Sequence, residues 1–152
     1  MKAVIQRVSR ASVDVDDKTV GSCGRGYMIL LGVAEGDTEQ DAELLCKKIA
    51  NLRIFPDDEG KMNRSIKDID GEALVISQFT LLANYRHGNR PDFLESAKPD
   101  VADRLHEYFK KLLADEIRHV GAGIFGAHMQ VSLINDGPVT IVMDSEVLKK
   151  KK

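Results

Sequence analysis

The sequence predicts an α+β protein, a single domain of layered, largely antiparallel β-sheets covered by two main helices. The chain has 152 residues, of which 43% are hydrophobic and 30% charged, as in one compact domain. It has no Trp, five Phe and three Tyr, so the core must be mainly aliphatic, which suits sheets covered by helices. Apolar residues alternate near both ends and recur at helical spacing in two segments between. We expect the domain over residues 1–145 and a basic tail over residues 146–152.

The first half of the chain predicts a hairpin, a buried strand and a helix. Residues 2–15 alternate as a strand, and the turn signal that follows them closes a hairpin with Thr19 and Val20. Residues 27–33 are continuously apolar, which favours a central strand buried on both faces. Residues 38–41, Thr-Glu-Gln-Asp, are typical of a capping box. The helix that they start ends near Leu52, with Ala42, Leu45, Ile49 and Leu52 on its inner face.

The second half predicts a strand over residues 73–79, a polar loop over residues 83–92 and a helix from about Asp100. Residues 129–134 alternate as a further strand. Then Gly137-Pro138 interrupts what otherwise reads as two consecutive strands. Taken alone, this step is either a hairpin turn or a place where backbone carbonyls are presented to a ligand.

Charge and targeting signals limit the function. The net charge of −2 does not indicate a nucleic-acid-binding surface over the whole protein, so any RNA contact must be local. The candidates are residues 86–90, the trio Arg53, Lys61 and Arg64, and the lysine run 149–152. A lysine run at the end of a chain is more typical of a solvated, disordered tail than of a binding site. No signal peptide or membrane span is predicted, and we expect a soluble, cytoplasmic protein with no membrane contact.

No catalytic or metal-binding spacing stands out. Cys23 and Cys46 lack any Cys-x-x-Cys or Cys/His cluster, so we expect buried thiols, no metal and no cofactor. The histidines, which we expect in structural or surface roles, form no nucleophile–base pattern: His87, His106, His119 and His128. Ser77 and Thr80 therefore have no evident general base.

Two segments carry a family resemblance. Ser-Gln-Phe-Thr-Leu at 77–81 and Asn-Asp-Gly-Pro-Val-Thr at 135–140 closely resemble the signature motifs of the D-aminoacyl-tRNA deacylases, first described as D-tyrosyl-tRNA deacylases. Four further segments are also similar to this family, namely residues 1–8, 51–55, 60–63 and 126–133. The chain departs from the family at Leu82, where an aromatic residue is common, and in the loop 86–90, which is a less regular basic run.

The resemblance implies an enzyme that hydrolyses the ester between a D-amino acid and the terminal adenosine of tRNA, releasing free tRNA and the D-amino acid. It also implies removal of glycine misattached to alanine tRNA. A homodimer with active sites at the subunit interface is implied too. In it, the Gly137-Pro138 step, with a cis bond, enters from the neighbouring subunit and excludes L-amino acids.

Within that site, the resemblance places Ser77, Gln78, Phe79 and Thr80. The N–H groups of Phe79 and Thr80 suit a developing oxyanion, and the adenosine 2'-hydroxyl is expected to assist attack by water. Phe125 and Met129 are expected either at the wall that receives the adenine or in the core.

Two other functions stay open at this point. A noncatalytic RNA- or DNA-binding module of the same fold would use Ser77 and Thr80 only for structure. A generic serine or threonine esterase is the other, although no histidine is paired with either hydroxyl in the sequence. Arg7 either braces the Gly137-Pro138 step or makes an ordinary surface ion pair.

Overall fold

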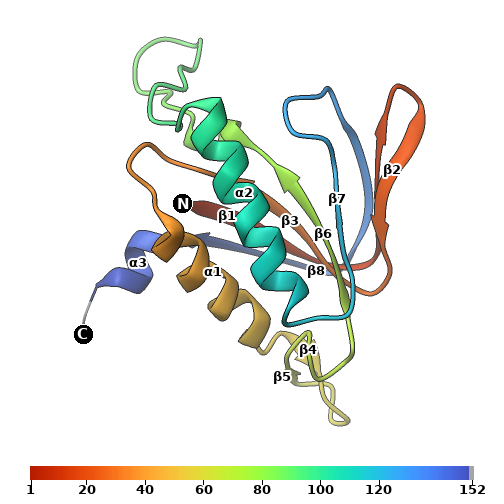
Figure 1. Cartoon of the computed structure of the whole chain (residues 1–152). Coiled ribbons are helices and arrows are strands. Elements are labelled where there is room, and N and C mark those ends of the chain that lie inside the picture. Colours follow the sequence, from red (N-terminus) through yellow and green to blue (C-terminus); the bar gives the residue numbers. More distant parts are fainter. Residues whose placement is uncertain (151–152) are drawn as a thin grey trace.

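One long strand, β1, organises the sheet at the centre of the structure (Figure 1). The computed structural model describes residues 1–150. β1 (Lys2–Val15) pairs along almost its whole length with β8 (Gln130–Asp144). On its other side, its first half pairs with β3 (Gly26–Gly32) and its second half with β2 (Lys18–Cys23). All three pairings are antiparallel, as the sequence predicts.

Two further strands extend the sheet beyond β3. β6 (Glu72–Ser77) pairs parallel with β3, and β7 (Val120–Ala122) pairs parallel with β6. A separate small sheet is formed by β4 (Phe55–Pro56) and β5 (Met62–Arg64). The predicted central strand is confirmed, because β3 lies in the middle of the order β2-β1-β3-β6-β7.

The predicted α+β layering is confirmed by two hydrophobic clusters. Helices α1 (Glu39–Asn51) and α2 (Pro99–Ala114) cover one face of the sheet (Figure 1), and Leu45, Ile49, Leu105 and Phe109 lie in the larger cluster there. The smaller cluster packs side chains of β1 and β2 against Met28, Leu74 and Ile76 of β3 and β6. Burial of this apolar surface is the main force that holds the layers together.

The helix ends agree with the sequence signals. Thr38 is the N-cap of α1, and its backbone N–H donates to Oδ2 of Asp41 at 2.9 Å, as in a capping box. Pro99 starts α2, where its missing N–H costs no helical hydrogen bond. No helix in the described part of the chain is long and apolar enough to cross a membrane.

Two expectations about secondary structure are wrong. The predicted strand 73–79 ends at Ser77, and Phe79–Leu82 form a short 3-10 helix, η1. The Gly137-Pro138 step is not a hairpin turn, because β8 continues through it against β1. A proline is tolerated in a strand where its missing backbone N–H is not needed for a hydrogen bond to the neighbouring strand. Pro138 meets this condition because it lies in a bulge.

The first part of the expected tail is helical. Residues Ser145–Lys149 form helix α3, in which the Lys149 ammonium lies 2.8 Å from a carboxylate oxygen of the buried Asp41. A local lysine run does not reveal this partner, which lies on a distant helix. Lys151 and Lys152 lie outside the described residues.

Candidate active site

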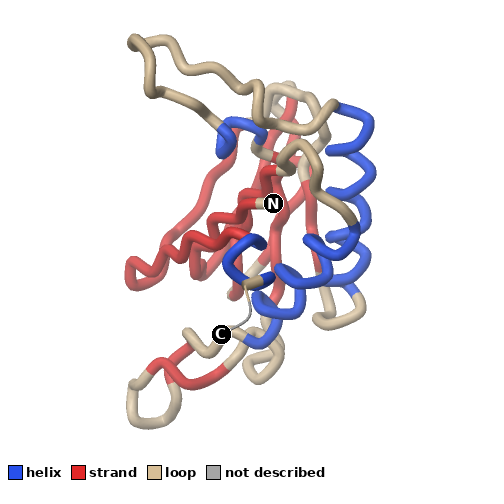
Figure 2. The backbone as a smooth tube through the Cα atoms, turned by 90° about the vertical axis from the view of Figure 1, so that its left-hand side faces the viewer, coloured by secondary structure: helices blue, strands red, loops and turns tan. Residues whose placement is uncertain are grey.

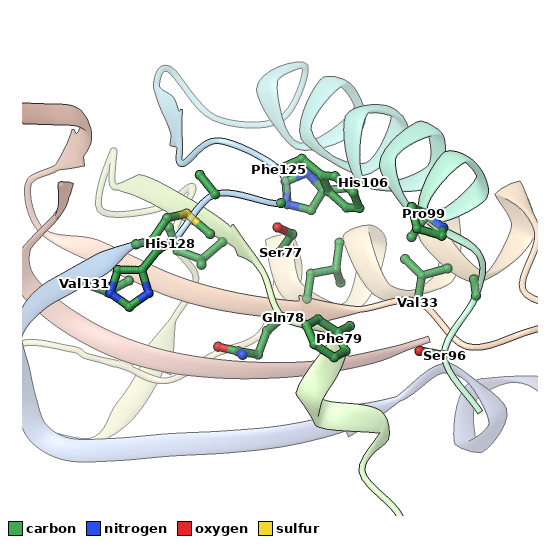
Figure 3. A pocket seen from close by; sticks show the side chains of 17 residues that line it. Val33, Ser77, Gln78, Phe79, Ser96, Pro99, His106, Phe125, His128 and Val131 are labelled. Atoms are coloured by element: carbon green, nitrogen blue, oxygen red, sulfur yellow. The ribbon is translucent and has the colours of Figure 1, made fainter. Parts of the chain in front are cut away.

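A cavity of about 510 Å³ opens between the end of β6, helix α2 and the segment that leads into β8 (Figure 3). This volume is in the range of small-molecule sites. The lining is mostly apolar, with a few polar side chains: Leu31, Val33, Ile76, Ser77, Gln78, Phe79, Ser96, Ala97, Pro99, Ala102, His106, Phe125, Gly126, Ala127, His128, Met129 and Val131. The cavity therefore brings together two segments that lie some fifty residues apart in the sequence.

One wall is positioned by the pairing of β6 with β3. Ser77 lies opposite Leu31, and the N–H of Gln78 donates to the carbonyl oxygen of Leu31 at 2.8 Å. Gly32 permits this close approach, because a Cβ there would lie 2.9 Å from the carbonyl oxygen of Gln78. The chain then turns into η1, so Ser77, Gln78 and Phe79 all face the cavity.

Thr80 lies at the rim and does not line the cavity. Its hydroxyl accepts a hydrogen bond from Nε2 of Gln78 at 2.5 Å, so it orients that amide. Phe79 is 57% exposed and packs edge-on against Phe93, with ring centroids 5.1 Å apart. Neither the N–H of Phe79 nor that of Thr80 has an acceptor within residues 1–150, as is usual at a helix start.

The opposite wall comes from the segment before β8. Phe125 and Met129 both line the cavity, and Met129 also packs against the smaller hydrophobic cluster, so for Met129 both alternatives hold. Gly123 leaves room for Met129, whose sulfur would have to shift to accommodate a Cβ at that position. Together these residues give the cavity its apolar wall opposite Ser77 and Gln78.

His106 is a cavity residue that the sequence did not reveal. It lies on the inner face of α2, next to Leu105, and is only 4% exposed. Neither ring nitrogen has a hydrogen-bond partner in the described structure. Burial, with the Lys110 charge as a lesser cause, lowers the pKa of His106 to about 4, so the ring is neutral near pH 7. In the sequence, the one sign that His106 is buried was its position beside Leu105, which faces the core.

Gly137 and Pro138 lie away from the cavity. Gln6 pairs with Thr140 and Val8 with Asn135, so residues 136–139 bulge out opposite Arg7. Gly137 and Pro138 are exposed, and the peptide bond between them is cis. The side chain of Asn135 supports the bulge by accepting a hydrogen bond from the N–H of Val139 at 3.1 Å.

Arg7 braces this bulge. Its Nε donates to the carbonyl oxygen of Asp136 at 3.0 Å, and its Nη1 donates to the carbonyl oxygen of Ile54 at 2.6 Å. The Nε of Arg7 also lies 3.7 Å from a carboxylate oxygen of Asp136, so both roles left open by the sequence, brace and ion pair, are present. The guanidinium ties the bulge on β8 to the segment that precedes β4.

The candidate RNA-binding residues differ in their availability. Arg53, Lys61 and Arg64 each contact a neighbour within residues 53–64, namely Asn63, Glu59 and Asp58. Arg86, His87 and Arg90 are exposed on the loop between η1 and α2, which Figure 2 shows extending away from the sheet. This loop follows η1, which forms one wall of the cavity, directly in the chain.

The two cysteines and one cluster of carboxylates lie outside the cavity lining. Cys23 and Cys46 are buried, and burial raises the pKa of their thiols to about 11 and about 12. Carboxylates of Asp37, Asp41 and Glu146 lie close enough together to hold a metal ion. However, the N-terminal ammonium contacts Asp37 at 2.7 Å, and Lys149 contacts both other carboxylates, so cations of the chain already balance this cluster.

A family model described as D-Tyr-tRNA(Tyr) deacylase matches residues 4–144. The chain belongs to this family. It is 58% identical to the D-aminoacyl-tRNA deacylase of Roseiflexus castenholzii, over all of this chain and 97% of that protein. It is 59% identical to a D-aminoacyl-tRNA deacylase of Dehalococcoides mccartyi, over 95% of each. The chain is thus a D-aminoacyl-tRNA deacylase, a hydrolase that acts on aminoacyl-tRNA.

Solved structures share the fold of this deacylase. One, described as c-Myc DNA Unwinding Element Binding Protein, is 42% identical, with a TM-score of 0.90 over 95% of this chain and 98% of that one. Another, described as a "probable eukaryotic D-amino acid tRNA deacylase", is 17% identical, with a TM-score of 0.78 over 93% of this chain and 97% of that one. At this low identity, the likeness shows only that the two chains share a fold.

Proposed function

We propose that the cavity binds the aminoacylated 3' end of tRNA, and that the enzyme proofreads translation by hydrolysing D-aminoacyl esters in the cytoplasm. The observation that carries this proposal is the convergence of Ser77, Gln78 and Phe79 with Phe125 and Met129 on one cavity. The polar wall suits the ester, and the apolar wall suits a base or an amino-acid side chain.

The proposed hydrolysis uses the backbone N–H groups at the start of η1. The N–H groups of Phe79 and Thr80 lack acceptors in the described chain, so they are available to a developing oxyanion. Ser77, Gln78 and the neighbouring Thr80 supply no general base, and the two histidines that line the cavity, His106 and His128, come from α2 and from the segment before β8. We assign activation of the attacking water to the 2'-hydroxyl of the terminal adenosine, with Gln78 held in place by Thr80.

In this proposal, the backbone of a second copy of the chain distinguishes D-amino acids from L-amino acids. Gly137 and Pro138 are exposed and lie outside the cavity lining of their own chain, as a step that serves another copy must. A wall at this place collides with an L side chain but not with a D side chain or with glycine. The proposal therefore includes hydrolysis of glycyl-tRNA, including glycine misattached to alanine tRNA.

A homodimer is supported by the surface of β8. This strand pairs only with β1 among the described strands, so its other edge is unpaired, and Ile134 and Val142 are 47% and 76% exposed. Exposed apolar groups on an edge strand favour association with a partner. The Arg7 contacts anchor the base of the bulge that carries the proposed wall.

The proposal is tested by following ester loss from D-tyrosyl-, L-tyrosyl- and glycyl-tRNA with purified enzyme. We expect rapid hydrolysis of the D-tyrosyl and glycyl esters and none of the L-tyrosyl ester above the spontaneous rate. Equal hydrolysis of both tyrosyl esters would contradict the chiral wall. Hydrolysis of small esters with inhibition by acylating reagents would instead indicate a generic esterase.

A second function is favoured by one comparison. The 42% identical structure is described as a DNA unwinding element binding protein. Binding of this chain to single-stranded DNA, unaffected by saturating D-aminoacyl-tRNA, would support a separate nucleic-acid-binding role. Competition between the two ligands would place DNA in the tRNA site.

A further inference from the structure

His106 is a polar group whose hydrogen-bonding capacity the folded chain leaves unused. It lines the cavity at the α2 side, is 4% exposed, and has no partner for Nδ1 or Nε2 within the described residues. Burying a polar group without a hydrogen-bond partner costs free energy. A Phe or Leu at this position would pack on the sheet without that cost, so the ring nitrogens need a partner from outside the chain.

The chemistry of that partner follows from the state of the ring. Burial and Lys110 hold the pKa of His106 low, while Glu107 and Asp103 oppose this only weakly. A neutral imidazole offers one donor and one acceptor. The ring of Phe125 lies 6.4 Å away, tilted by 56°, and Figure 3 shows the two side chains next to each other above Ser77. An aromatic wall beside a donor and an acceptor suits a flat heterocycle with both kinds of group on its edge.

The substrate carries one such heterocycle in every case. The aminoacyl side chain changes from one substrate to the next, so an obligatory polar partner for it would restrict the enzyme to few amino acids. The terminal base of tRNA is always adenine, which presents the N6 amino group as a donor and an adjacent ring nitrogen as an acceptor. A fixed partner for His106 is therefore the base rather than the amino acid.

We propose that His106 is a specificity-determining residue that hydrogen-bonds the edge of the terminal adenine of aminoacyl-tRNA. This inference rests on the proposed placement of the tRNA 3' end in the cavity. It predicts that part of the binding energy depends on the 6-amino group of the base and on His106 together, so that removing either one removes the same contribution.

The test compares D-tyrosyl-tRNA ending in adenosine with D-tyrosyl-tRNA ending in purine riboside, which lacks the 6-amino group. His106→Phe keeps an aromatic ring beside Phe125 and removes both nitrogens, and His106→Gln restores a donor and an acceptor. His119→Phe is the matched control, because His119 is exposed and lies outside the cavity. For wild type and the His119→Phe control, we expect KM to rise roughly tenfold on the purine substrate, as for loss of one buried hydrogen bond.

For His106→Phe we expect a KM roughly tenfold above wild type on the normal substrate and no further rise on the purine substrate, with kcat nearly unchanged. His106→Gln should recover part of the discrimination. Equal sensitivity of wild type and His106→Phe to the missing amino group would overturn the proposal.

Binding of free adenosine and purine riboside, followed by NMR of the His106 ring, gives a readout that needs no turnover. Adenosine should shift the ring signals of wild type and bind His106→Phe more weakly, even if D-tyrosyl-tRNA proves not to be hydrolysed. Hydrolysis without any His106-dependent difference between the bases would refute this inference alone. Thermal unfolding supplies a further check, since His106→Phe should be at least as stable as wild type; a large loss of stability would show a structural role instead.

Discussion

The Nε atom of Arg7 donates a hydrogen bond to the carbonyl oxygen of Asp136, the residue immediately before the exposed Gly137-Pro138 step. The same guanidinium holds the carbonyl oxygen of Ile54. One side chain on β1 thus ties the base of the bulge on β8 to the segment that precedes β4. If that bulge is the chiral wall, Arg7 controls selectivity without touching the reacting ester.

Replacement of Arg7 should therefore change which esters are hydrolysed. We expect Arg7→Met to hydrolyse L-tyrosyl-tRNA at a rate closer to the D-tyrosyl rate, lowering the D/L ratio by roughly tenfold or more, because the wall loses its brace. Unfolding free energy should fall by about 1–3 kcal/mol, since the carbonyl of Ile54 loses its partner. Arg10→Met, an exposed change on the same strand, is the control. An unchanged D/L ratio in a destabilised Arg7→Met enzyme would show that the brace serves stability only.

The proposed oxyanion donors can be tested at Phe79. Phe79→Pro removes its N–H at the first position of η1, where a missing N–H breaks no hydrogen bond within the helix. The preceding Gln78, with φ −145° and ψ 83°, lies outside the helical region that a following proline disfavours. Phe79→Ala removes the same side chain but keeps the N–H. We expect kcat of Phe79→Pro to be about 10²–10³-fold below that of Phe79→Ala, as for loss of one oxyanion donor. Equal kcat values in single-turnover measurements would remove this N–H from the mechanism.

The role of the 2'-hydroxyl can be tested in the substrate. D-tyrosyl-tRNA ending in 2'-deoxyadenosine, with the ester on the 3'-oxygen, should be hydrolysed at least about 10²-fold more slowly at saturation, because the group that activates water is missing. Its binding, measured by competition, should change little. A normal kcat with this substrate would require a protein side chain as the base.

The contact between Lys149 and Asp41 predicts a pH-dependent contribution to stability. Burial raises the pKa of Asp41, but hydrogen bonds from Lys149, Ser145 and the Thr38 N–H outweigh it and lower the pKa to about 2. A carboxylate with a lowered pKa stabilises the fold above its ordinary pKa near 4 and loses this contribution as the pH falls toward 2. We expect Lys149→Met to be less stable than wild type at pH 7, and the difference to shrink between pH 4 and pH 2. The exposed neighbour Lys150→Met should behave as wild type in the same denaturant series.

Much of the fold is predictable because its signals are local. The alternation of β1, the apolar run of β3 and the capping box at Thr38 each depend on adjacent residues, and each element forms where expected. The site was predictable in part for a different reason. Motif resemblance indicated Ser77, Gln78, Phe79 and Thr80, of which the first three line the cavity. Phe125 and Met129, which were expected at its wall or in the core, line it too.

The missed features depend on distant partners. Proline after glycine is typical of a turn, and only pairing with β1 and the Arg7 side chain makes it a bulge within β8. The tail lysine Lys149 is ordered by Asp41, which lies on α1. His106 looks like any helical histidine until its lack of partners is seen in three dimensions.

The central claim is that the Gly137-Pro138 step of one subunit guards the cavity of another. It is tested most directly by mixing two variants after verified subunit exchange: Pro138→Gly, with a weakened wall and an intact cavity, and an excess of Phe79→Pro, with an intact wall and an impaired cavity. We predict that L-tyrosyl-tRNA hydrolysis per Pro138→Gly subunit falls to the wild-type level, while D-tyrosyl-tRNA hydrolysis persists. Unchanged L-tyrosyl-tRNA hydrolysis in the mixed dimers, or a protein that remains monomeric, would contradict the claim.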